Sequence, residues 1–221
     1  MRTPIAEGEF YHVYNRGVEK RNIFSRPEDY DRFLVLLHLC NSTESVHMSV
    51  LKRRKKNIFD LFTVDRGEQI VAIHAYILMP NHFHLLIQAK RGDASIGIFM
   101  QKFTTAYTMY FNKLNGRVGG LFQGTYKSIH VDSDQYLQYL FAYLHSNSFP
   151  LFKIDKPRSD MNKVLNYRYS SILDYRGVIR PENAIVDRSF FQEYCKNDET
   201  IKEYLKLWLT YHNHDGTNVQ G

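Results

Sequence analysis

Residues 79–87 have the sequence MPNHFHLLI, and they carry the strongest structural signal in the chain. Pro80 and Asn81 mark a turn, because proline lacks the N–H group that a central sheet position needs. The stretches on either side, residues 70–78 and 82–88, are rich in β-branched and apolar side chains, as strands are. The pattern therefore predicts a β-hairpin that turns at Pro80 and Asn81.

His82 and His84 are separated by one residue in the second of these strands. Side chains alternate across a strand, so the two imidazoles share one face while Phe83, Leu85 and Ile87 share the other. The apolar face is expected to pack on a core. The two imidazoles could bind a divalent cation, given one or two further ligands. Two exposed histidines on a half-buried sheet are the alternative, and spacing alone leaves both open.

Further elements are predicted on both sides of the hairpin. They are a strand over 10–16, a helix over 27–40, a helix over 94–114, a strand region over 121–131 and a helix over 133–147. Pro27 opens the first helix and acidic residues follow it, while Ser133 is a good N-cap for the last one. The order strand, helix, strand, strand, helix, strand, helix predicts a βαββαβ ferredoxin-like antiparallel sheet with one added helix, an α+β fold.

Two segments fit this plan less well. Residues 41–69 show weak periodicity and hold the basic run KRRKK at 52–56, so we expect a basic insertion there with a short helix or hairpin. After Pro150 the chain is irregular until a final helical stretch over 189–212. We therefore expect one main domain over 1–177 and a helical C-terminal extension over 178–221.

Composition excludes several classes of protein. The 221 residues are 43% hydrophobic and 24% charged, as in ordinary globular chains. The best apolar run, 70–79, is far shorter than the roughly 20 residues of a membrane span, and the first ten residues lack the apolar core of a secretory signal. Cys40 and Cys195 are too few for a disulfide framework or a cysteine zinc site. We therefore expect a soluble cytoplasmic protein.

Charge and aromatic content favour a nucleic-acid partner. The formal net charge is +6 and aromatic residues make up 14%; cations neutralise phosphates, and aromatic rings stack on unpaired bases. The candidate phosphate contacts are basic side chains near the predicted strands and in the basic run: Arg16, Lys20, Arg21, Lys52, Arg53, Arg54, Lys55, Lys56 and Lys127. The alternative for the basic run is a solvated loop.

The helix predicted over 133–147 offers a candidate nucleophile. Tyr143 and Asn147 are four residues apart and share a helical face. The phenol has a pKa of about 10, and a bound cation would lower the cost of deprotonating it for attack on phosphorus. Tyr136 and Tyr139 lie on the same helix, so helical facing alone does not choose among the three tyrosines. Tyrosines at this spacing are also common in cores.

MPNHFHLLI resembles the HUH motif, two histidines around a hydrophobic residue, of single-tyrosine transposases. Four other stretches, YHVYNRGVEKRNIF, LFQGTYKSIHVDSDQYL, YLHSN and NYRYSSILDY, are similar to the REP-associated tyrosine transposases of bacteria. The resemblance runs from about Phe10 to Gly177. It implies that residues 1–177 form a single-tyrosine HUH transposase domain with the ferredoxin-like sheet.

Carried over residue by residue, the resemblance implies that His82 and His84 bind Mg²⁺ or Mn²⁺, that Asn147 is a third metal-site residue and that Tyr143 is the nucleophile. The implied activity is metal-dependent cleavage and rejoining of single-stranded DNA, which leaves a 5′-phosphotyrosine and a free 3′-OH. The implied substrates are hairpin-forming repeats with a short recognition tag beside the hairpin. Oligomeric state stays open, because related enzymes include homodimers that share active sites as well as monomers.

The chain departs from the family at two places. Thr125 stands where relatives commonly have Arg, so one DNA-backbone contact is in doubt. NSFP follows the tyrosine motif in place of the usual Asn-Pro, which leaves the helix end open.

Two other functions remain at this stage. An HUH replication initiator or relaxase-like nuclease usually arranges the histidine pair and the tyrosine differently, and relaxases often add a third histidine. A non-catalytic ferredoxin-like nucleic-acid-binding module would need neither the paired histidines nor Tyr143 and Asn147. Among the other histidines we expect His12, His38, His74 and His145 to be structural, while His130 could approach the site if its strand lies beside that of His82.

Overall fold

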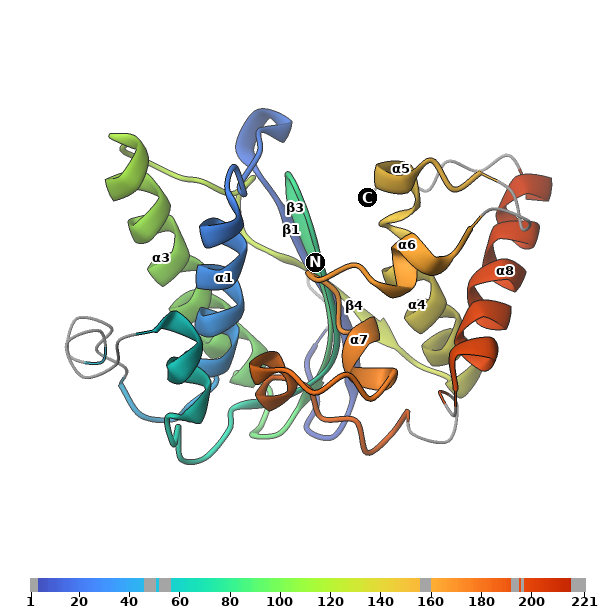
Figure 1. Ribbon diagram of the computed structural model, residues 1–221. Helices are drawn as coiled ribbons and strands as arrows, with labels where there is room; N and C mark the ends of the chain where they lie inside the picture. The colour runs from blue at the N-terminus through green and yellow to red at the C-terminus, as the bar shows by residue number, and fades with distance from the viewer. Residues whose placement is uncertain are drawn as a thin grey trace.

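The computed structural model describes residues 4–45, 51, 57–155, 160–191, 195 and 197–215. Its centre is a four-stranded antiparallel sheet with helices on both faces (Figure 1). The strands are β1 (Phe10–Arg16), β2 (Val71–Met79), β3 (His82–Ala89) and β4 (Lys127–Val131), in the order β2-β3-β1-β4. This order, with one strand skipped by each helical crossover, confirms the predicted ferredoxin-like α+β fold.

The helices divide between the two faces of the sheet. Helices α1 (Pro27–Leu39) and α3 (Ser95–Asn115) cover one face, and α4 (Asp134–Ser146) covers the other, with α8 (Asp198–Asp215) packed outside it (Figure 1). Short elements complete the fold: η1 (Val18–Lys20), η2 (Ile58–Thr63), α5 (Phe149–Phe152), α6 (Asn162–Leu165), α7 (Ile172–Tyr175) and η3 (Pro181–Ala184). In the part of the chain with described coordinates, no helix has the length and apolar character needed to cross a membrane.

Strand β3 has the two different faces that its sequence predicts. Phe83, Leu85 and Ile87 are fully buried beneath α1 and α3, where the Phe83 ring lies 5.1 Å from that of Phe33. The predicted turn joins the two strands directly, since Met79 pairs with His82. The alternation therefore directs His82 and His84 toward the α4 face.

The strand predicted over 121–131 is shorter in the structure. Only Lys127–Val131 pairs with β1 as a strand, and residues 121–126 form a loop. Gly124 has a φ of +70°, a conformation that glycine adopts without the steric cost that a side chain imposes. This backbone turn interrupts the pairing with β1 between Gln123, whose N–H donates to Arg16 O at 2.8 Å, and Lys127, which pairs with Tyr14.

The irregular part of the chain covers the outer edge of the sheet. Along β2, the N–H of Leu78 donates to Tyr169 O at 2.9 Å, and that of Ser171 donates to Tyr76 O at 3.0 Å. Farther along, Asp187 N donates to Ile73 O at 2.8 Å. These bonds occupy backbone groups that an open edge strand would expose. The division of the chain at residue 177 stays a prediction.

The described part of the predicted insertion over 41–69 includes the short 3-10 helix η2. Asn57 caps it, since its side-chain oxygen accepts from Phe59 N at 3.0 Å. The basic run Lys52, Arg53, Arg54, Lys55 and Lys56 lies outside the described residues.

Candidate active site

The two histidines of the HUH-like motif lie on the sheet face that α4 covers. His84 is only 2% exposed, while His82 is half-buried at the start of β3. Their ring centroids are 5.1 Å apart and their planes are nearly perpendicular, at 87°. The alternative of two exposed histidines is therefore wrong, because the pair lies inside the molecule between sheet and helix.

The hydrogen bonds of His82 determine which of its nitrogens is free. Its Nδ1 is 2.7 Å from Asn81 Oδ1, and Asn81 directs its amide Nδ2 to Lys20 O at 3.2 Å. Because the Asn81 oxygen can only accept, His82 Nδ1–H is the donor of this bond. In the neutral ring Nε2 then keeps its lone pair, as a metal ligand must.

A third histidine, His12 on β1, contacts His84. The distance from His12 Nε2 to His84 Nδ1 is 2.8 Å, and the rings are nearly parallel with centroids 5.0 Å apart. When His84 Nδ1–H donates to His12, Nε2 of His84 carries the lone pair, which is the arrangement that metal-binding histidines commonly use. Our expectation that His12 is structural thus misses a contact inside the site.

The sequence contains part of the information that places His12 in the site. His12 and Tyr14 are two residues apart on β1, so they share a face, and Tyr14 pairs directly with His84. Alternation within residues 10–16 shows the shared face, but the register between β1 and β3 is needed to bring His12 to His84.

All three imidazoles are neutral at physiological pH. Burial lowers the pKa of His12 to about 4 and, with a smaller contribution from the Arg16 charge, that of His82 to about 4. Burial also holds the pKa of His84 well below its ordinary value, and the neighbouring histidines act in the same direction. Desolvation penalises the charged ring, so the site offers nitrogen lone pairs instead of protonated cations.

Of the three tyrosines on α4, Tyr143 is the one that contacts the histidines. Its ring centroid lies 5.8 Å from that of His12 and 5.9 Å from that of His84, both edge-on. Tyr139 stacks on the outer side of Tyr143 at 6.3 Å and is 40% exposed, and Tyr136 stacks on Tyr139 at 6.2 Å. The tyrosines form a row along the helix, and only its last member reaches the sheet site in the described structure.

The environment of the Tyr143 hydroxyl favours the protonated phenol. Burial raises its pKa, the nearby hydroxyls of Tyr14 and Tyr139 raise it further, and a hydrogen bond with Asn147 acts in the opposite direction. At neutral pH the hydroxyl therefore keeps its proton. A group that stabilises the phenolate is needed before this oxygen can act as a nucleophile.

Asn147 at the end of α4 faces both the nucleophile candidate and the histidine pair. Its Nδ2 donates to Tyr143 O at 2.9 Å and to Leu144 O at 3.2 Å. Its side chain also interacts with the His82 imidazole and the Tyr143 hydroxyl. With both N–H groups on backbone carbonyls, the amide oxygen is the atom left to accept a hydrogen bond or to bind a cation.

The histidine nitrogens and the Asn147 oxygen are suitable ligand atoms for a divalent cation. His82 Nε2 and the amide oxygen of Asn147 both carry lone pairs and repel each other. A proton or a cation between them would be attracted to both atoms. The described residues contain no group of three or more His, Cys, Asp and Glu that could hold a metal. The candidate ligands are therefore two imidazoles and one amide oxygen, with water or substrate completing an octahedron.

Two of the basic candidates lie beside this site. Arg16 pairs with His82 in the sheet, and Lys127 lies over the Tyr14 ring, with its Nζ 5.6 Å from the ring centroid. Tyr14 itself stacks on His84 at 5.4 Å. Arg16 and Lys127 therefore bring positive charge beside His82 and Tyr14.

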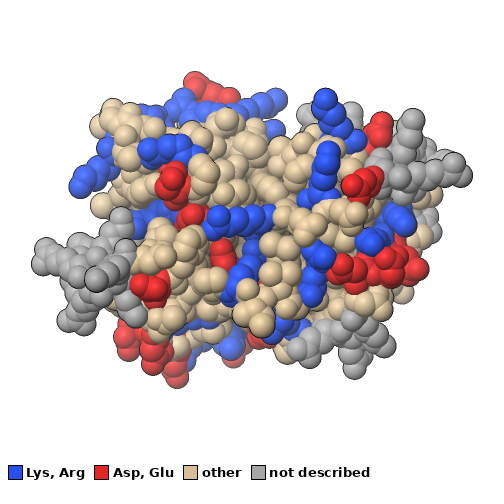
Figure 2. All heavy atoms as spheres, viewed as in Figure 1, with Lys and Arg blue, Asp and Glu red and all other residues tan. Residues whose placement is uncertain are grey.

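The other two described basic candidates, Lys20 and Arg21, differ in how free their charges are. Lys20 is exposed on η1, whereas the guanidinium of Arg21 donates to Glu19 at 2.7 Å and is engaged within the protein. In Figure 2, Lys and Arg are spread over much of the visible face and are interrupted by groups of Asp and Glu. Charge on this face is therefore dispersed and does not form one basic patch.

His130 does not approach the site, contrary to the possibility that its strand would bring it there. It pairs with Tyr11 on β1 and therefore lies on the opposite sheet face, where its Nε2 is 2.9 Å from Glu9 Oε2. His145, which belongs to α4, is buried and points away from the site, with its Nδ1 2.8 Å from Ser170 Oγ. The remaining two, His38 and His74, bond to backbone carbonyls as structural histidines do.

Comparisons with known proteins agree with this arrangement at the level of family. The family described as "Transposase IS200 like" matches residues 32–147, more than half of the chain, and this range includes His82, His84, Tyr143 and Asn147. No curated protein matches the sequence.

Two solved structures are similar at low identity. One is described as a REP-associated tyrosine transposase bound to a REP hairpin; it has a TM-score of 0.46 and 14% identity, and the match covers 86% of this chain and 93% of that one. The other is a tRNA(His) guanylyltransferase from Saccharomyces cerevisiae, with a TM-score of 0.33 and 14% identity over 81% of this chain and 82% of that one.

Proposed function

Because this chain belongs to the IS200-like transposase family, we propose that it cleaves and rejoins single-stranded DNA at hairpin-forming repeats through a 5′-phosphotyrosine on Tyr143. The observation that carries the proposal is the edge-on contact of the Tyr143 ring with His84 and His12. This contact brings the proposed nucleophile on α4 next to the histidines of the sheet. The family assigns DNA transposition in general, and this contact supports the specific mechanism that we propose.

His82, His84 and Asn147 would hold Mg²⁺ or Mn²⁺, the two histidines through Nε2 and Asn147 through its amide oxygen. When bound, such a cation neutralises phosphate charge and lowers the cost of deprotonating a nearby hydroxyl. The chain's own contribution is to keep the imidazoles neutral by burial and to orient them through Asn81 and His12.

In the cleavage step, the Tyr143 oxygen forms a bond to the phosphorus while the bond from phosphorus to the 3′-oxygen breaks. The tyrosine proton is lost and the released 3′-oxygen takes up a proton, so the products are a 5′-phosphotyrosine and a 3′-OH. Attack by a 3′-OH on the phosphotyrosine reverses these changes and rejoins DNA. Arg16 and Lys127 would hold the phosphates during both steps.

The two alternative functions fit the chain less well. A non-catalytic binding module does not account for membership of a transposase family. A relaxase-like nuclease would use a third histidine as a ligand, and His12 is the one histidine near the pair in the described structure. Because Nε2 of His12 is directed to His84 Nδ1 at 2.8 Å, His12 supports a ligand and is not oriented as one.

DNA binding should favour a hairpin with an unpaired flank over a random duplex of equal length. A buried tyrosine needs a phosphodiester that can bend into the site, and one stacked base contributes about 1–3 kcal/mol, which is about 5- to 150-fold in affinity. We expect at least this preference in fluorescence anisotropy at one fixed, physiological salt concentration. Equal affinity for the two DNAs would contradict the proposed substrate, while salt dependence alone would not separate them.

Replacing His12 with Phe should weaken Mn²⁺ binding without removing it. The variant keeps an aromatic ring against Tyr143 but removes the hydrogen-bond partner of His84 Nδ1. Loss of a hydrogen bond that orients a metal ligand typically lowers metal affinity by about 10–100-fold. Calorimetric Mn²⁺ titration measures the change, and cleavage should recover at high Mn²⁺. His130→Phe, on the opposite sheet face, is the matched control. Unchanged Mn²⁺ affinity in His12→Phe would show that His12 does not orient the ligand.

A further inference from the structure

Tyr14 on β1 lies on the histidine face of the sheet and takes no part in the cleavage step described for Tyr143. It pairs with His84 across the sheet. Its ring stacks on those of His84 and His12, with centroids 5.4 and 4.9 Å apart and planes inclined by 23° and 27°. The three rings therefore stand side by side on the sheet. Stacking explains the ring of Tyr14, but its hydroxyl needs a separate explanation.

The Tyr14 hydroxyl lies close to that of Tyr143. Side chains stand roughly perpendicular to a sheet, and tyrosine is longer than histidine, so the hydroxyl extends beyond the imidazole rings on the side of α4. Burial is the main cause that raises the pKa of Tyr143, and the Tyr14 hydroxyl is the next largest. Tyr14 acts in the same direction on Tyr136. The site thus contains a second phenol beside the proposed attacking oxygen.

The hydroxyl of Tyr14 is free, unlike those of several structural tyrosines in this chain. Tyr107 donates to Ile23 O and Tyr167 donates to Leu78 O, both at 2.6 Å, as tyrosines packed in a core usually do. Tyr14 is half-buried, and its hydroxyl makes no hydrogen bond to any of the described residues. Its O–H group can therefore donate to a ligand that enters the site.

Lys127 adds a positive charge beside the same phenol. It pairs with Tyr14 between β1 and β4, and its Nζ lies 5.6 Å from the centroid of the Tyr14 ring. At this distance the face of the ring attracts the ammonium group. Lys127 is otherwise exposed, so its charge is not consumed inside the protein. A hydroxyl donor and an ammonium group on adjacent strands suit an anionic oxygen.

The geometry of displacement at phosphorus indicates which oxygen this is. The attacking and leaving oxygens lie in line on opposite sides of the phosphorus, and the non-bridging oxygens lie between them. A hydroxyl beside the attacking oxygen of Tyr143 is therefore far from the leaving 3′-oxygen and close to the non-bridging oxygens. These atoms carry the negative charge of the phosphodiester, and fixed donors directed at such charge lower the barrier of the reaction.

We propose that Tyr14 is a second catalytic tyrosine, whose hydroxyl donates a hydrogen bond to a non-bridging oxygen of the phosphate that Tyr143 attacks, an inference that rests on the proposed function. The proton stays on Tyr14 throughout, and the bonds that form and break are those of the cleavage step. The ring of Tyr14 supports His84 and Lys127, while its hydroxyl stabilises the charge on the phosphate.

The first test replaces Tyr14 with Phe in the full chain. The ring keeps its contacts with His84, His12 and Lys127, so the thermal unfolding midpoint and the affinities for Mn²⁺ and for a flanked hairpin should be nearly unchanged. Loss of one donor to a developing charge typically lowers a rate by about 10²–10³-fold. We expect that fall in the single-turnover rate of adduct formation. Tyr136→Phe is the matched control and should react at the unaltered rate.

The second test separates a direct contact with the phosphate from a structural effect of the substitution. Each non-bridging oxygen of the cleaved phosphate is replaced in turn with sulfur, which accepts hydrogen bonds weakly. In the unaltered chain and in Tyr136→Phe, sulfur at one of these positions should slow cleavage because the Tyr14 hydroxyl loses its acceptor. In Tyr14→Phe the same sulfur should cause no such slowing. Two changes that remove one and the same interaction are not additive.

Sulfur effects of equal size in the unaltered chain and in Tyr14→Phe would overturn the inference. So would a slower rate in Tyr14→Phe that high Mn²⁺ restores, because the substitution would then act through the metal ligands. If the unaltered chain forms no adduct with Mn²⁺, the proposed function fails and the role of Tyr14 fails with it. If the unaltered chain forms the adduct and Tyr14→Phe forms it equally fast, only the role of Tyr14 fails.

Discussion

Replacing Tyr143 with Phe will abolish the covalent protein–DNA adduct while leaving the fold and the DNA affinity nearly unchanged. The substitution removes only the hydroxyl, and the ring can keep its contacts with His12, His84 and Trp208. Loss of a nucleophile typically lowers a rate by about 10⁴-fold or more, so no adduct should be visible. A denaturing gel of protein incubated with a labelled flanked hairpin and Mn²⁺ measures the result.

Tyr136→Phe and Tyr139→Phe are the matched controls on the same helix. Both rings lie farther along the tyrosine row, and their hydroxyls should not be needed for cleavage, so both proteins should form the adduct. A normal adduct in Tyr143→Phe would mean that another residue is the nucleophile. Mass spectrometry of the peptide linked to DNA would then identify it.

The protein in which both His82 and His84 are replaced with Ala should lose DNA cleavage altogether. Two of the three candidate ligands disappear, so Mn²⁺ and Mg²⁺ should no longer bind at the site in calorimetry, and no strand should be cut in a gel assay. In the unaltered protein a chelator should stop cleavage, and added Mn²⁺ should restore it. Cleavage by the double variant at the unaltered rate would refute the metal assignment.

Folding of this variant must be measured beside its activity. His84 is buried, and truncation of a buried side chain leaves a cavity that costs stability. Circular dichroism and thermal unfolding report that effect. The single variant His82→Ala changes a half-buried residue at the strand end and should lose metal binding with less loss of stability. His130→Ala changes a histidine on the other face and should cleave normally.

Much of the fold could be predicted from local sequence patterns. Pro80 and Asn81 define the hairpin turn, and the alternation in residues 82–88 assigns one face to the core and the other to the histidines. Ser133 caps α4 as expected, since its side chain accepts from Tyr136 N at 3.3 Å. These features depend on residues close together in the chain, where the periods of helix and strand apply directly.

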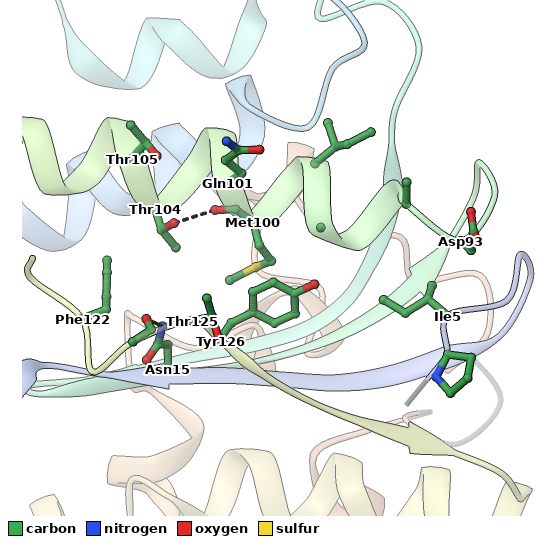
Figure 3. Close-up of a pocket in the computed structure, with 15 residues that line it drawn as sticks. Ile5, Asn15, Asp93, Met100, Gln101, Thr104, Thr105, Phe122, Thr125 and Tyr126 are labelled. Atoms are coloured by element: carbon green, nitrogen blue, oxygen red, sulfur yellow. Dashed lines mark hydrogen bonds between the residues drawn. The ribbon is translucent and has the colours of Figure 1, made fainter. Parts of the chain in front are cut away.

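Local patterns alone could not predict the extent of β4 or the cavity of about 820 Å³ between α3 and residues 121–126 (Figure 3). Residues 121–126 have the composition of a strand, but they form a loop, with a positive φ at Gly124, a bond from Asn15 Nδ2 to Gly124 O and a bond from Gln123 N to Arg16 O. Among the segments that line this cavity are β1, α3 and the loop of residues 121–126. A cavity between segments is a property of their packing, and no single segment contains it.

The sequence by itself determined the ferredoxin-like order of elements and the shared face of His82 and His84. It also determined the pairing of Tyr143 with Asn147 on one helix. Only the tertiary structure placed His12 against His84 and removed His130 from the site. The reason is strand register: a shift of one residue between β1 and a neighbour would reverse which side chains share a face. That register is set by contacts between residues far apart in the chain.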